Sequence, residues 1–136
     1  MKIVEKLSSE KGNQLVESAI LLPLFLFILL GVADLGMGFS TYIALTNSAR
    51  EGARWMTIHP DDRSGSISRI HNEIQNIGLN PTDVQISFSP NQTSYESGDI
   101  VTIAVRHDYT LLFGAFTYLP PLQLDSRATM RVLYDF

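Results

Sequence analysis

Residues 12–33, GNQLVESAILLPLFLFILLGVA, decide the fold of this chain. The sixteen residues 18–33 carry no charge, and as a helix rising ~1.5 Å per residue they would span ~24 Å. Leu15 and Val16 extend the apolar run past Glu17, towards the ~30 Å thickness of a hydrocarbon core. The pattern predicts a membrane-inserted helix with one carboxylate near its start, where burial of a charge is costly.

Composition limits the nature of the chain beyond this helix. The chain has 136 residues, 45% hydrophobic and 18% charged, which leaves room for one small folded domain and is too apolar for a disordered chain. A net charge of −4 argues against nucleic acid as a partner, because phosphate binding needs a basic surface. The absence of cysteine excludes disulfides and thiolate metal sites.

The charges are unevenly distributed along the chain. All three lysines precede the apolar run, whereas the sequence after Gly12 carries seven arginines and twelve acidic residues. The positive-inside rule therefore places the N-terminus in the cytoplasm and predicts that the C-terminal part is exported.

Three interpretations of the N-terminal region compete. A secretory signal peptide would use the small residues Gly31 and Ala33 as its cleavage site, although the helical pattern continues past them. A plain uncleaved anchor would place Glu17 at the headgroup level. A prepilin-type signal would be a short charged leader ending in Gly12, with Glu17 as the fifth residue of the mature chain.

The second half of the helix is predicted from its periodicity. Past Asp34, apolar residues recur at steps of three and four, and the helix should end near Met56 or Thr57, before Pro60. Pro23 should kink or locally open the first half. Small residues recur every four positions and form a ridge that lets another backbone approach closely, either from the chain's own domain or from another subunit. They are Gly36, Ser40, Ala44, Ser48 and Gly52.

The remaining residues predict a small α+β domain. Ser66 is expected to cap a second, amphipathic helix whose isoleucine stripe ends before Gly78. Alternating apolar residues then predict antiparallel strands over 84–88, 101–105 and 124–134. The stripe consists of Ile67, Ile70, Ile74 and Ile77.

Between the second and third strands lies LLFGAFTYLPP, residues 111–121. It is too apolar for an ordinary exposed loop. We expect it to fold over the sheet rather than to form a partner-binding patch, because exposed apolar patches of that size are uncommon.

The sequence offers no candidate active site, so we predict no catalytic residue, no cofactor and no metal. His59, His71 and His107 lack ligand spacing, and no glycine-rich phosphate loop follows a strand. Asp61 and Asp62 stand together in a turn, where such residues usually cap or face solvent.

Two motifs in order resemble a known family. Gly12, Asn13 and the glutamate at position 17 look like the processing site of class III signal peptides, and the apolar run followed by NSAREGAR resembles the TadE-like minor pilins, or pseudopilins, of tight-adherence (Flp, type IVb-like) pili. Ser18 stands where the major pilins carry an aromatic residue, and a domain follows the helix, which favours a minor pilin. The family motif covers Ala49, Arg50, Glu51, Gly52, Ala53 and Arg54.

The resemblance implies the roles of these residues. A prepilin peptidase would cleave between Gly12 and Asn13, and Glu17 would act in assembly. The partners would be that peptidase, other pilins or pilus assembly platform proteins, and membrane lipid. Independently of the resemblance, helix spacing predicts that Glu51 reaches Arg54 across one turn, worth ~0.2–0.5 kcal/mol if the pair is exposed. The alternative is that the motif is simply a solvated helical turn.

The sequence thus predicts a leader over 1–12, a long helix over 13–57 with about 15–38 in the membrane, and a small extracytoplasmic domain over 58–136. The fold class is α+β, with one short helix on an antiparallel sheet of about three strands. The implied function is that of a non-enzymatic minor pilin in the bacterial inner membrane. The alternative is an anchored or secreted envelope binding domain without a pilus role.

Overall fold

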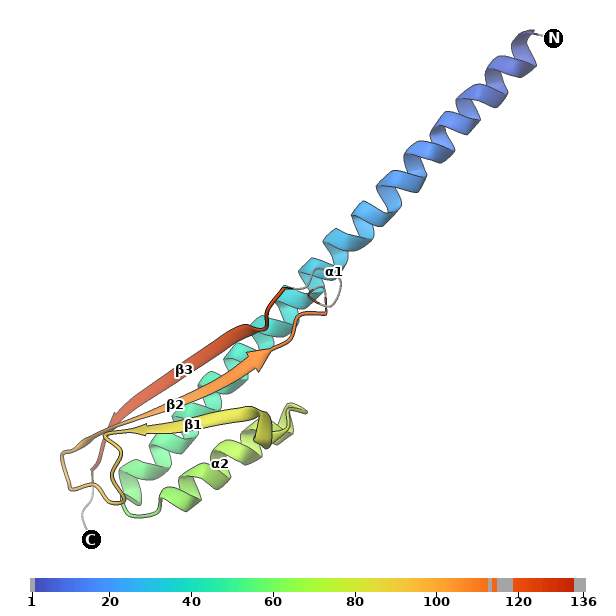
Figure 1. The fold of residues 1–136 in the computed structure, drawn as a ribbon. Helices are drawn as coiled ribbons and strands as arrows, with labels where there is room; N and C mark the ends of the chain where they lie inside the picture. Colours follow the sequence, from blue (N-terminus) through green and yellow to red (C-terminus); the bar gives the residue numbers. More distant parts are fainter. Residues whose placement is uncertain (1, 113, 115–118, 134–136) are drawn as a thin grey trace.

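A computed structural model describes residues 2–112, 114 and 119–133, with side chains from Gly12 onward. Helix α1, Lys2–Ile58, runs without interruption through Pro23 and projects far beyond the rest of the chain (Figure 1). It begins well before the expected boundary at Gly12. Its end at Ile58 lies within two residues of the prediction and just before Pro60, as expected for a residue that cannot continue a helix.

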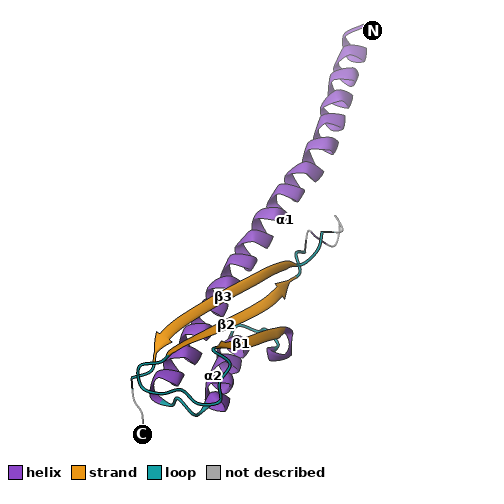
Figure 2. Cartoon of the chain, turned by 60° about the vertical axis from the view of Figure 1, so that its left-hand side comes forward, coloured by secondary structure: helices purple, strands orange, loops and turns teal. Residues whose placement is uncertain are grey.

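The second half of α1 carries a small α+β domain, which confirms the predicted fold class. Its elements are α2 (Arg63–Asn76), the short 3-10 helix η1 (Pro81–Asp83), β1 (Val84–Ser89), β2 (Ile100–Tyr109) and β3 (Leu122–Arg131). The strands form one antiparallel sheet in the order β1-β2-β3. The sheet lies along α1, with α2 beside α1 (Figures 1 and 2).

The inner face of the sheet is built by the predicted alternation. Ile103 stands opposite Phe88 on β1 and Ala128 on β3, and all three side chains are buried. Facing them are the small and apolar residues of α1 and the isoleucines of α2. The core comprises Leu45, Ala49, Ala53, Met56, Ile70, Ile74, Val84, Phe88, Tyr95, Val101, Ile103, Val105, Leu124, Ala128 and Val132.

The N-terminus of α2 differs from the prediction. Asp62, and not Ser66, is the N-cap, and its carboxylate Oδ1 accepts the backbone N–H of Gly65 at 2.9 Å. Ser66 instead lies inside the helix, fully buried. Because the Asp62 carboxylate accepts a free N–H group of the first turn, the helix starts one turn before the predicted cap at Ser66. Ile77, expected on the buried stripe, follows the last helical residue and is 46% exposed.

The described part of segment 111–121 does not lie over the sheet as predicted. It follows β2 at the end of the domain nearest the projecting half of α1 (Figures 1 and 2). The backbone N–H of Leu112 donates to Asp34 Oδ1 of α1 at 2.9 Å. The carboxylate therefore holds this segment against the helix; residues 113 and 115–118 lie outside the described residues.

Candidate functional site

The first feature of interest is the projecting half of α1, which nothing else in the described chain covers. Every side chain from position 12 to 29 is exposed, including Leu15 at 72% and Ile20 at 67%. Of the described helices, this one is long and apolar enough over Gly12–Ile58 to cross a membrane. So much apolar surface in water would be costly, and the helix is compatible with single-pass membrane anchoring.

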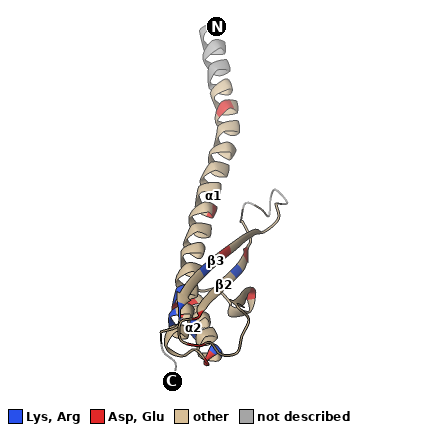
Figure 3. Cartoon of the chain, turned by 90° about the vertical axis from the view of Figure 1, so that its left-hand side faces the viewer, with Lys and Arg blue, Asp and Glu red and all other residues tan. Residues whose placement is uncertain are grey.

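The predicted processing and assembly residues all lie on this bare helix. Gly12 and Asn13 are helical and exposed, and a Cβ built on Gly12 would meet nothing within 4 Å. Glu17 is exposed one turn further along. Figure 3 shows that most of the coloured, charged positions fall in the domain, whereas the described part of the projecting half of α1 carries very few. An approaching protein can therefore reach all three residues without moving another element.

The structure divides the ridge of small residues. Gly36 and Ser40 are exposed, Ala44 is half-buried, and Ser48 and Gly52 are buried. A Cβ on Gly52 would lie 2.5 Å from Ile70 Cδ1 of α2, whereas one on Gly36 would meet nothing within 4 Å. The chain's own second helix thus occupies one end of the ridge, and the end nearer the N-terminus is open.

The segment 49–54 shows the same division between its small and its charged residues. Ala49, Gly52 and Ala53 are buried, while Arg50 and Arg54 are exposed one turn apart. Small side chains on the buried side let α2 and the sheet approach the helix closely. The two arginines remain available on the outer face.

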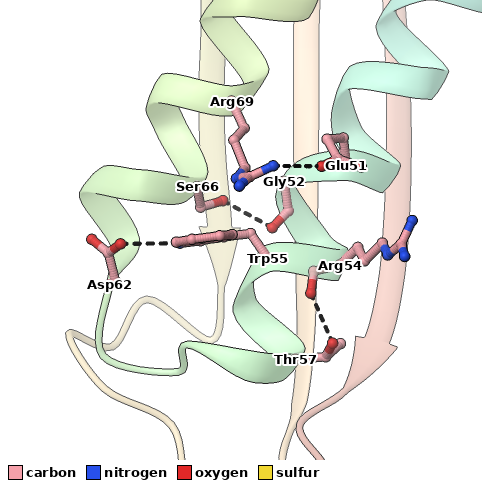
Figure 4. A network of polar contacts seen from close by, with 8 residues as sticks. All are labelled: Glu51, Gly52, Arg54, Trp55, Thr57, Asp62, Ser66 and Arg69. Atoms are coloured by element: carbon pink, nitrogen blue, oxygen red, sulfur yellow. Dashed lines mark hydrogen bonds and ion pairs between the residues drawn. The ribbon is translucent and has the colours of Figure 1, made fainter.

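Glu51 does not pair with Arg54 as predicted. Its Oε1 instead lies 3.0 Å from Arg69 Nη1, a residue of α2 (Figure 4). The neighbouring helix offers a guanidinium that is better placed than one on the next turn of the same helix. Because Arg69 is 44% exposed, the pair adds at most ~1 kcal/mol to stability.

A polar network connects α1 and α2 (Figure 4). Trp55 Nε1 donates to Asp62 Oδ2 at 3.1 Å, and Ser66 Oγ donates to the carbonyl oxygen of Gly52 at 3.0 Å. The Arg69 guanidinium lies 4.0 Å from the centre of the Trp55 ring. These contacts join the two helices at the end of the domain farthest from the N-terminus.

Asp62 makes the stability of the domain depend on pH. Hydrogen bonds from the backbone of Gly65 and from the side chains of Ser64 and Trp55 lower its pKa. A carboxyl whose pKa is lower in the folded than in the unfolded state (about 3.9) adds stability above that value, and the contribution is lost as pH falls through the folded pKa. We expect the thermal midpoint to fall as pH drops below about 4, with a smaller drop in Asp62→Asn than in the original chain.

The fluorescence of Trp55, the single tryptophan, measures this transition. Some acid dependence should persist in the variant, because hydrogen bonds from Arg127 and Arg106 lower the pKa of Asp125 as well. Equal acid dependence in the original chain and in Asp62→Asn would show that the cap does not contribute.

Sequence reasoning missed the contact made by Asp34. This carboxylate is only 1% exposed and joins α1 to the segment after β2, 78 positions further along the chain. The available signal was that Asp34 is the one charge between positions 18 and 49. A lone acid in an apolar helix needs a partner, but the sequence does not say which.

Beside Asp34 lies an apolar groove of about 400 Å³ between α1 and the ends of β2 and β3. Burial, and then the negative charge of Asp34, raises the pKa of the Tyr109 hydroxyl in its wall. The side chains that line the groove are Asp34, Leu35, Gly38, Phe39, Tyr42, Tyr109, Leu111, Leu122 and Leu124.

His59 and His107 make separate contacts in the described part of the chain. Among the described residues, no group of three His, Asp or Glu side chains could hold a metal ion. His107 Nδ1 lies 3.0 Å from the carbonyl oxygen of Asp83, and the His59 ring stacks on Trp55 with centroids 3.8 Å apart. Both contacts are structural.

Comparison with known proteins gives a match that lies within helix α1. The family model described as TadE-like protein matches residues 12–54, from the predicted processing glycine to the last arginine of the AREGAR motif. No curated protein and no solved structure matches the chain. The resemblance noted in the sequence is thereby confirmed over residues 12–54, which are similar to the TadE-like family.

Proposed function

We propose that this chain is a minor pilin, or pseudopilin, that supports assembly of a tight-adherence pilus from the bacterial inner membrane. The observation that carries the proposal is the match of residues 12–54 to the TadE-like family on a helix whose first half is bare. A helix segment that is apolar all round and stays exposed in its own fold is suited to lipid or to other apolar helices. The chain would act by association and not by catalysis.

Anchoring and assembly use the same half of α1 in this proposal. The lysines before Gly12 keep the N-terminus in the cytoplasm, and the domain after the helix is exported. A prepilin peptidase cleaves between Gly12 and Asn13, and the new N-terminus then begins the helix. Other pilins or platform proteins pack against the apolar side chains between that end and the domain.

The position of Asp34 supports the prepilin interpretation against a secretory signal peptide. Cleavage after Ala33 would cut α1 in the middle and would begin the mature chain at the very carboxylate that anchors Leu112. Cleavage after Gly12 would leave all contacts of the domain intact. A plain uncleaved anchor keeps the same contacts, so only the mature N-terminus separates it from a pilin.

The proposal is tested by identifying the N-terminus of the mature protein in cells that contain a prepilin peptidase. Asn13 is expected; Met1 would indicate a plain anchor, and Asp34 a secreted domain. Gly12→Trp should accumulate a precursor about twelve residues longer, because a bulky side chain obstructs the close approach of the peptidase to the backbone.

Gly31→Ala is the matched control for the glycine substitution. It alters another open glycine of the same helix, where an added Cβ would meet nothing within 4 Å, and it should leave processing normal. Normal processing of Gly12→Trp, seen by mass spectrometry, would contradict the prepilin assignment.

A further inference from the structure

We infer that the ends of β2 and β3 form a second membrane contact, which seats the domain on the outer leaflet beside the anchor. The contact surface, here called the leucine edge, consists of Leu111, Leu112, Leu119 and Leu122. Its occupant is lipid at the boundary between acyl chains and headgroups. The inference rests on the membrane anchoring in the proposed function and adds a defined orientation of the domain.

The position of the leucine edge along α1 sets its depth relative to the membrane, which is the first argument for the contact. From Leu15 to Asp34 the helix advances nineteen residues, or ~28 Å, close to the ~30 Å of a hydrocarbon core. The hydrogen bond from the Leu112 N–H to Asp34 brings the leucine edge to this same level. If the apolar helix fills the bilayer, the leucine edge lies at its outer surface.

The leucine edge is also apolar and uncharged, which is the second argument for the contact. No charged residue occurs from position 109 to 124, although every other stretch of that length in the domain contains charges. Leu112, Leu119 and Leu122 are 53%, 52% and 48% exposed. Three half-exposed leucines on one edge would be unfavourable in water, whereas contact with lipid removes that surface from water.

Two tyrosines lie just beyond this level, on the side of the domain: Tyr109 packs beside Gly38, four residues past Asp34, and Tyr42 follows one turn later. Tyr42 of α1 and Tyr109 of β2 both line the groove next to Asp34, and Tyr42 is 42% exposed. Tyrosine is enriched where a protein meets the headgroups, because its ring is apolar and its hydroxyl is polar. Charged residues begin again on β2 and β3 at Asp108 and Asp125, on the side away from the anchor.

Lipid suits this surface better than a second pilin does. The groove and the leucine edge are continuous with the bare face of α1 through Leu35 and Phe39, which are 69% and 66% exposed. The surface that the bilayer covers along α1 thus continues without a polar break onto the end of the domain. A neighbouring subunit is the alternative occupant, and the experiment separates the two.

The chain has no cysteine, so single cysteines can report the environment of chosen positions in the full-length protein. Leu112→Cys and Leu119→Cys test the edge, Leu26→Cys marks the membrane helix, and Ile100→Cys marks the far end of the sheet. Leu26 and Ile100 are 55% and 52% exposed, which matches the test positions. Each variant carries an NBD fluorophore and is placed in nanodiscs of phosphatidylethanolamine and phosphatidylglycerol, at one protein per disc.

Nitroxide lipids then locate each fluorophore. We expect blue-shifted emission at positions 112 and 119, at least twofold stronger quenching by a shallow acyl-chain nitroxide than at position 100, and preferential quenching by a deep nitroxide at position 26. Trp55 fluorescence verifies that each variant is folded.

Each other outcome overturns the inference in a recognisable way. Water-like emission at 112 and 119, with position 26 in lipid, removes the second contact but leaves the anchor. Blue-shifted emission at 112 and 119 that requires several proteins per disc assigns the edge to a neighbouring subunit. Water-like emission at position 26 as well removes the membrane anchoring itself, and the proposed function fails with it.

Discussion

Gly52→Leu is expected to lower the thermal midpoint of the domain by ~8–16 °C. A Cβ at this position would already lie 2.5 Å from Ile70 Cδ1, 2.6 Å from Ile70 Cγ1 and 3.1 Å from Ser66 Oγ. Overpacking of a dense core costs ~1–3 kcal/mol and occasionally more, and each kcal/mol lowers the midpoint of a small domain by ~4–8 °C. The gain in helix propensity, at most ~1 kcal/mol, does not offset this cost.

Gly36→Leu is the control on the same ridge. It makes the same change four turns earlier, where an added Cβ would meet nothing within 4 Å. We expect its midpoint to stay within a few degrees of the original. The measurement is thermal unfolding of the detergent-solubilised chain, followed by the fluorescence of Trp55, whose ring contacts the His59 ring and the Arg69 guanidinium.

The steric origin of the effect can be tested separately. Gly52→Ala should be destabilising alone, and Ile70→Val, which removes the nearer of the two clashing carbons, should recover part of that loss in the double variant. Strictly additive effects would contradict a direct contact between these positions. Equal midpoints for Gly52→Leu and Gly36→Leu would show that the buried half of the ridge carries no tight packing.

The elements of the fold were predictable because each has its own periodicity. The uncharged run after Glu17 indicates a membrane helix, and the alternation at Val101, Ile103 and Val105 indicates a strand with one buried face. Both patterns depend only on neighbours in the sequence. Tertiary packing did not override them, so the fold class followed.

The details that were missed depend on residues far apart in the chain. Glu51 has a possible partner at Arg54, but α2 brings Arg69 nearer, and no local pattern reports the position of a second helix. The N-cap was misassigned for a different reason. The turn before α2 offers several capping side chains in a row, and the choice of Asp62 also reflects its hydrogen bond with Trp55.

The candidate site shows the same limit. Spacing alone identified the ridge from Gly36 to Gly52, but identical spacing at both ends could not show that α2 covers only one of them. Asp34 is a lone charge in an apolar stretch, but its partner Leu112 lies 78 positions further along the chain, after β1 and β2. The order in which helices and strands pack decides which residues a surface contacts. The spacing of residues along one helix or strand does not reveal that order.

The second large effect is expected at Glu17. Glu17→Gln should reduce incorporation into pili, or co-purification with other pilins, at least tenfold, while leader cleavage and membrane insertion persist. The carboxylate is exposed on the bare part of α1 and lies one turn beyond the predicted mature N-terminus. Removing one partner of an ion pair that is buried away from water costs ~3–5 kcal/mol. A cost of that size weakens binding more than tenfold.

Cleavage changes the surroundings of this carboxylate. In the uncleaved chain Glu17 lies well inside α1, which begins at Lys2. After cleavage it would be the fifth residue of the mature chain, near unsatisfied N–H groups and the positive end of the helix dipole. The new amino group of a neighbouring subunit would supply the counter-charge in a low-dielectric environment, where an unpaired carboxylate is costly.

Two variants separate this pairing from simpler roles. Glu17→Asp keeps the charge and should retain part of the assembly, whereas Glu51→Gln removes a carboxylate from the domain surface and should leave assembly normal. Insertion should not suffer in Glu17→Gln, because a neutral side chain enters the bilayer more easily than a charged one. Normal pilus formation by Glu17→Gln would reduce Glu17 to a residue at the membrane surface. Loss of insertion would mean that the carboxylate places the helix in the bilayer and does not join subunits.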